Sequence, residues 1–140
     1  MNVVVRWALV AITVIGLAVD AYTHFHLASM YAFNKTSVVS EETLFRIEAV
    51  LAILAALAVL IRPNGLTATI ALLVAAGGLA LLLIYRYVDV GKIGPIPDMY
   101  DPGWFKEKVI SALGEAVAMV GSLGLLVASM ATRRRRAVRV

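Results

Sequence analysis

The sequence contains no cysteine, and only 16% of its 140 residues are charged. The absence of cysteine excludes a disulfide framework, thiol redox chemistry and cysteine-ligated metal sites. Soluble domains carry about 25% charged residues, whereas 61% of this chain is hydrophobic. The composition therefore predicts an integral membrane protein, in which any redox role would need a bound cofactor or a partner subunit.

The chain also contains no glycine-rich phosphate loop, no nucleophilic triad and no nucleic-acid-binding module. Its formal net charge of +4 comes largely from arginines at 133–136 and 139, which directly follow an apolar stretch. Basic residues next to a span favour the cytoplasmic side and contact anionic headgroups. We therefore predict that Arg133, Arg134, Arg135 and Arg136 bind membrane lipids and not nucleic acid.

Four apolar segments are long enough to cross the roughly 30 Å of hydrocarbon in a bilayer. They cover about residues 7–28, 42–61, 66–88 and 105–131, followed by a basic tail at 132–140. The short Arg62–Gly65 connection contains two helix breakers and predicts an antiparallel hairpin between the second and third spans. The fold class is thus all-α, a single antiparallel four-helix transmembrane bundle.

The distribution of basic residues between the connections predicts the orientation of the bundle. Arg6, Arg62 and the tail arginines fall on one side, and Lys35, Lys92, Lys106 and Lys108 fall on the other. We expect a multi-pass protein of the cytoplasmic membrane with both termini in the cytoplasm.

Ionisable residues inside the spans are the candidate functional residues, because charges at membrane depth are costly and face the bundle interior. Asp20, Glu48 and Glu115 are predicted to reach a similar depth, at 1.5 Å per residue. His24 lies one turn from Asp20 on the same helix face, whereas His26 is rotated away from it. The predicted polar cluster comprises Asp20, His24, Arg46, Glu48, Arg86 and Glu115.

Two interpretations of this cluster stay open. In the structural one, Arg46 and Arg86 neutralise the carboxylates and fix the helix register. In the functional one, the surplus acid and His24 form a binding or proton-exchanging pocket. Asp20, His24, Glu48 and Glu115 would also suit a divalent metal, whereas a haem is disfavoured because no other span offers a second histidine.

The connection at 89–101 predicts an ordered lid over this layer. Its glycines and prolines forbid regular structure, but its apolar residues are atypical of a solvated linker. The expected lid residues are Ile93, Pro95, Pro97, Tyr100 and Trp104. Asp101 followed by proline is the expected start of the fourth helix.

Small residues follow one face of the fourth span, at Gly114, Ala118, Gly121 and Ser122. Such a face lets two helices approach closely. Packing inside the bundle is the favoured interpretation, and a homo-oligomer interface is the alternative.

Residues 45–62 read Phe-Arg-Ile-Glu followed by an apolar run that ends in a basic turn, and residues 66–80 form the next apolar span. Together they resemble spans two and three of the DoxX-like four-helix membrane proteins. The acid–histidine cluster and the proline-rich loop depart from that family's pattern. The resemblance implies a small accessory subunit of a membrane redox system, and some such systems act on quinones or sulfur compounds. Of the family's polar positions, only Glu48 is matched in this sequence.

Two functions follow as hypotheses. The first is a non-catalytic accessory or assembly subunit of a larger membrane complex, such as a respiratory one, with other membrane subunits or copies of itself as partners. The second is a binding protein for a quinone, another amphipathic molecule or a metal at an outer-leaflet polar pocket. Transport is disfavoured, because the ionisable residues share one half of the membrane and the other half is apolar.

Overall fold

The computed structural model describes all 140 residues and consists of four long helices and one short 3₁₀ helix. In chain order they are α1 (Val3–Ala28), η1 (Ser29–Tyr31), α2 (Glu41–Ile61), α3 (Gly65–Tyr87) and α4 (Lys106–Val138). Each long helix is apolar and long enough to cross a membrane. The predicted all-α four-helix fold of a multi-pass membrane protein is therefore confirmed.

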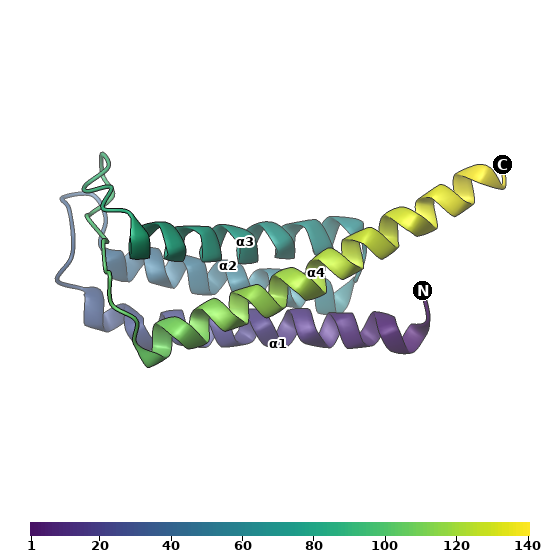
Figure 1. Ribbon diagram of the computed structural model, residues 1–140, viewed down its shortest axis with the longest axis horizontal. Coiled ribbons are helices and arrows are strands. Elements are labelled where there is room, and N and C mark those ends of the chain that lie inside the picture. Colours follow the sequence, from purple (N-terminus) through teal and green to yellow (C-terminus); the bar gives the residue numbers. More distant parts are fainter.

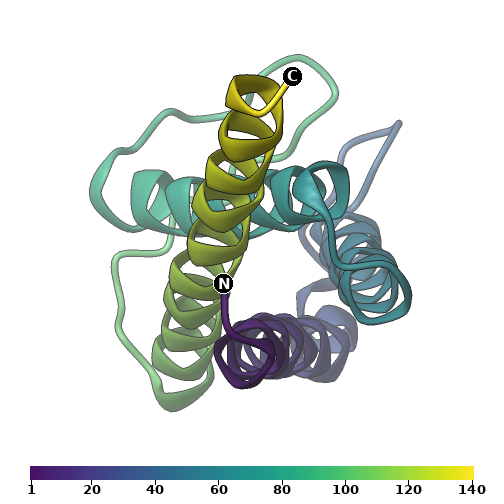
Figure 2. The same cartoon turned by 90° about the vertical axis from the view of Figure 1, so that its right-hand side faces the viewer.

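The bundle is elongated, with different features at its two ends (Figure 1). Both termini and the α2–α3 turn lie at one end, which we call the terminal end. Residues 29–40 and 88–105 lie at the opposite end, which we call the loop end. α4 runs obliquely across the bundle and packs against both α1 and α3 (Figures 1 and 2).

α2 and α3 begin and end within one residue of the predicted spans, whereas α1 begins four residues earlier, at Val3, and α4 ends seven residues later, at Val138. Asp101 is not its N-cap, because α4 begins at Lys106 after Phe105, which makes no side-chain cap. The Asp101 carboxylate instead accepts from the backbone nitrogen of Gly103 at 3.2 Å. At the other end, α4 continues through the arginines to Val138 and projects beyond the bundle (Figure 1).

A reciprocal cap at the start of α3 fixes the α2–α3 hairpin. Asn64 caps α3 by accepting from the backbone nitrogen of Thr67, whose side chain accepts in return from the Asn64 backbone nitrogen. This reciprocal cap satisfies two backbone donors that a helix N-terminus leaves free. At the other end of α2, Ser40 caps the helix by accepting from the backbone nitrogen of Thr43.

The closest helix contact joins α1 to α4 through small residues. A Cβ on Gly16 would lie 2.6 Å from the backbone oxygen of Gly114, and one on Gly121 would collide with the hydroxyl of Thr13. Ala118 and Ser122 are also fully buried. The small-residue face of α4 is thus used for packing inside the bundle, as the sequence favoured.

The core is built mainly from alanines, whereas many large apolar side chains face outward. Nine of the thirteen core residues are alanine, and residues such as Leu54, Leu73 and Val120 are more than half exposed. This arrangement suits a membrane, because lipid tails are as apolar as leucine and large apolar side chains can face them at no cost. Close packing of small residues then holds the helices together.

The two loop-end segments are joined by hydrogen bonds. Asn34 donates to the backbone oxygen of Asp98 at 2.8 Å, and Thr36 donates to that of Pro95 at 2.5 Å. Ile93 and Ile96 pair across a tight turn in which Gly94 has a φ of +54°, a conformation that favours glycine. The 89–101 connection is therefore an ordered structure, as predicted.

Candidate functional site

Four ionisable side chains converge between the helices near the loop end. Asp20 and His24 come from α1, Glu48 from α2 and Glu115 from α4. The three acids lie seven to nine residues from the loop end of their helices, which is about 11–14 Å along the axis. The structure thus confirms that they share one depth, and we call these four residues the carboxyl cluster.

Asp20 is the best connected member of the cluster. Its Oδ1 lies 2.9 Å from Nδ1 of His24, which also contacts the Asp20 backbone oxygen at 3.0 Å. Since a backbone oxygen can only accept, Nδ1 carries the proton in this arrangement. Ser111 of α4 donates to the same Oδ1 at 3.1 Å. Asp20 is therefore held in place from two helices.

A glycine on α3 makes room for the other two carboxyl groups. A Cβ on Gly78 would lie 2.5 Å from Oε1 of Glu115 and 2.8 Å from Oε1 of Glu48. Both carboxyl groups thus approach the same point of the α3 backbone. All four helices therefore take part in the site, α3 by lacking a side chain.

The cluster holds several buried oxygens without a hydrogen-bond partner. Asp20 and Glu115 are both 0% exposed. Oδ2 of Asp20, Oε1 of Glu48 and both side-chain oxygens of Glu115 accept no hydrogen bond from another donor group of the protein, and the carboxyl groups of Glu48 and Glu115 each contact that of Asp20. Polar groups buried in this way cost free energy unless they are satisfied, so the cluster is not explained as a packing element.

The structure contains no ion pair between these acids and an arginine, although the structural interpretation requires one. Arg46 is 56% exposed and pairs with Glu42 at 2.5 Å. It lies two residues from Glu48, and that spacing places the two side chains on nearly opposite faces of a helix. Arg86 lies in the last turn of α3, with its guanidinium 4.6 Å from the ring of Tyr87 and 5.3 Å from that of Trp104.

A pocket of about 370 Å³ opens between the helices on the loop side of the cluster. Twelve of its nineteen lining residues are hydrophobic, and His24 and Glu48 form part of its wall. Ile47, Leu51 and Leu81 line it and are also 49%, 45% and 55% exposed on the bundle surface. The pocket therefore reaches the face that contacts lipid, between α2 and α3.

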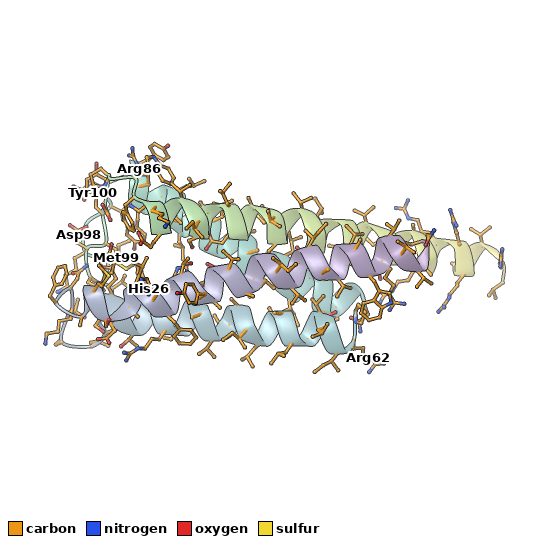
Figure 3. The ribbon with its side chains drawn as sticks, turned by 90° about the horizontal axis from the view of Figure 1, so that it is seen from below. His26, Arg62, Arg86, Asp98, Met99 and Tyr100 are labelled. Atoms are coloured by element: carbon orange, nitrogen blue, oxygen red, sulfur yellow. The ribbon has the colours of Figure 1, made fainter.

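The loop closes the pocket with residues other than the predicted ones. Ile96, Met99 and Asp101 line it, whereas Ile93, Pro95, Pro97, Tyr100 and Trp104 do not. Ile93 and Ile96 pair through their backbones across the turn, and Ile93 is 51% exposed whereas Ile96 lines the pocket. Figure 3 shows Met99 and Tyr100 beside Asp98 and Arg86 at the loop end, with Arg62 at the opposite end.

Several lining residues were missed by the sequence analysis as parts of a site. They are Tyr31, Glu41, Phe45, Tyr85, Lys108 and Ser111. The spacing of 41, 44, 45, 48 and 51 on α2, and of 78, 81, 82 and 85 on α3, is that of one helix face. Extending the stripe from Glu48 would have found those on α2.

The charged groups that line the pocket nearer the loops have partners, unlike several of the carboxyl oxygens in the cluster. Glu41 accepts from the Asn34 amide at 2.6 Å, and Lys108 pairs with Asp101 at 3.2 Å. Apart from His24 when protonated, Lys108 is the only cationic side chain that lines the pocket. It is already paired with Asp101. The unpartnered carboxyl oxygens are confined to the deeper end.

The two histidines have separate environments, as their spacing predicted. His26 is exposed and stacks on Tyr22 with ring centroids 5.8 Å apart, so it does not join the cluster. Ligand atoms of Asp20, His24 and Glu115 lie within 4.8 Å of one another. The predicted metal-ligating residues are thus brought together, with Glu48 beside them.

Comparisons with known protein families, curated proteins and solved structures find no match to this chain. The resemblance of residues 45–80 to the DoxX-like proteins therefore stays a prediction.

Proposed function

We propose that the protein binds an amphipathic small molecule that enters from the bilayer between α2 and α3. The observation that carries the proposal is the continuity of an apolar pocket with buried, unpartnered carboxyl oxygens. Small-molecule sites typically measure about 300–1,000 Å³ and combine apolar walls with a few polar groups. An apolar tail would occupy the pocket, and an oxygen-bearing head group would reach His24 and Glu48.

A quinone fits this description. Its ring would lie among Tyr31, Phe45 and Tyr85, which line the pocket. Its carbonyl oxygens would accept hydrogen bonds from a protonated carboxyl group or from His24. Aromatic walls favour a flat ring through stacked or edge-on contacts.

Lipid extraction of the purified protein, followed by mass spectrometry, tests the proposal together with thermal shifts on adding a short-chain quinone. Leu82→Trp fills the pocket and should abolish both signals. Leu83→Trp adds the same bulk next to it on an exposed part of α3 outside the pocket and should preserve them. A protein that carries no amphipathic molecule and shows no shift would contradict the proposal.

The accessory-subunit hypothesis stays a prediction. The small residues of α4 that would form a close helix–helix interface with a partner are used against α1, so such a partner would have to bind through the larger exposed side chains. Affinity purification in mild detergent, followed by mass spectrometry, tests it; a stoichiometric membrane partner would support it.

We further propose that the loop end is on the outer side of the cytoplasmic membrane, and that the arginines of α4 bind anionic headgroups on its inner side. Because the chain has no cysteine, Lys92→Cys and Arg139→Cys give clean probes of orientation. On intact cells, a membrane-impermeant maleimide should label the first and not the second. The reverse pattern would overturn the orientation.

A further inference from the structure

Charge balance at the carboxyl cluster points to a cation that the protein itself does not supply. Its members are three acids and one histidine, and neither an arginine nor a lysine pairs with any of them. Glu115 is the extreme case, being fully buried with both oxygens unpartnered. Isolated charges at membrane depth are costly and are usually compensated by a partner.

We propose that Asp20, His24 and Glu115 bind one divalent first-row transition-metal ion, with Glu48 as a fourth ligand. Three helices supply these ligands, and their atoms in the first three residues lie within 4.8 Å of one another. A metal ion lies about 2.1 Å from each ligand atom, so two ligand atoms on opposite sides of it are roughly 4 Å apart. The distances in the structure are close to this value, and small side-chain rotations would complete the site.

The donor set determines the class of metal. Imidazole together with carboxylates suits Zn²⁺, Fe²⁺ or Mn²⁺, whereas Ca²⁺ and Mg²⁺ prefer oxygen ligands alone. Asp20 and His24 are one turn apart on α1, the spacing that directs two ligands to the same point.

The surroundings of the ligands also fit a metal site. Ser111 donates to Oδ1 of Asp20 at 3.1 Å, and such contacts orient carboxylate ligands. Gly78 leaves the space that Glu48 and Glu115 occupy. Because His24 and Glu48 also line the pocket, the ion would be accessible to a ligand head group. The site uses the cluster of the proposed function but does not depend on an amphipathic ligand.

Metal binding is measured on the full chain, freed of any affinity tag and treated with chelator, in detergent. Co²⁺ serves as a spectroscopic probe, with Zn²⁺ as competitor and elemental analysis after gel filtration for stoichiometry. We expect one ion per chain and Co²⁺ absorption bands that Zn²⁺ abolishes. Asp20→Asn, His24→Ala and Glu115→Gln should each weaken binding by more than about 100-fold, since even supporting residues are worth roughly 10–100-fold.

Two further variants keep the test decisive if a ligand variant does not fold. Ser111→Ala should weaken binding by about tenfold through the orientation of Asp20, and His26→Ala, outside the cluster, should bind as the parent protein does. A parent protein that retains no ion, or ligand variants that bind as well as His26→Ala, would overturn the proposal. Since the metal alone is the probe, failure here leaves the amphipathic-ligand test unaffected.

Discussion

The α1–α4 contact and the carboxyl cluster both bury polar atoms, but the cluster leaves several of its carboxyl oxygens without a donor. Thr13 and Ser122 in the contact donate to backbone oxygens one turn earlier in their own helices. Glu115 in the cluster is equally buried, yet neither of its oxygens has a partner. A buried carboxylate costs far more than a buried hydroxyl, so we infer that the contact serves stability and that the cluster serves a ligand.

The largest loss of stability is expected from a substitution that breaks the α1–α4 contact. Gly16→Val would place a Cβ 2.6 Å from the backbone oxygen of Gly114 and 2.7 Å from the backbone nitrogen of Ala118. Backbone atoms cannot rotate away, so we expect a loss of about 3 kcal/mol or more, measured by thermal unfolding in detergent. Gly77→Ala, where nothing lies within 4 Å of the added Cβ, is the control and should melt at or above the parent temperature. Equal melting of both variants would refute the close contact.

A smaller loss of stability is expected at Asp20, the cluster residue that has hydrogen-bond partners. Asp20→Asn replaces the charged acceptor that His24 and Ser111 contact. Hydrogen bonds to charged groups contribute roughly 1.5–3 kcal/mol, so the metal-free variant should lose about 2 kcal/mol in the same melts. An unchanged melting temperature would mean that these contacts do not hold Asp20.

A glycine substitution inside the cluster should separate binding from stability. In Gly78→Ala the added Cβ meets the flexible ends of Glu48 and Glu115, which can rotate away. The helix also gains up to about 1 kcal/mol from alanine over glycine, so stability should change by less than about 1 kcal/mol. Metal or quinone binding should weaken at least severalfold in titrations. Unaltered binding would show that the two carboxyl groups need not approach α3.

The smallest loss is expected at the arginines. Arg46→Ala removes one exposed ion pair with Glu42, and such pairs contribute roughly 0–1 kcal/mol. It should leave the melting temperature nearly unchanged and ligand binding intact. A loss as large as that of Asp20→Asn would restore the ion-pair interpretation.

Counting residues along the apolar spans was sufficient to predict the fold and the shared depth of the acids. The same counting was insufficient for Arg46, because depth says nothing about direction around the helix, and two residues reverse it. It also failed for the lid, because counting residues does not tell which side chains of an irregular segment point inward. Lys108 and Ser111 lie seven and four residues before Glu115 in α4, on the same helix face, so extending the stripe from Glu115 would have found them.

Glu115→Gln tests the central claim most directly, namely that Glu115 serves a ligand and contributes nothing to the stability of the ligand-free bundle. Thermal unfolding of this variant and of the parent protein is compared in detergent with chelator present. Because no donor group outside the carboxyl cluster hydrogen-bonds to Glu115, and neutralising it removes a buried ionisable group next to Asp20, we predict a melting temperature equal to or above that of the parent. A decrease as large as that of Asp20→Asn would contradict the claim and show that Glu115 stabilises the bundle.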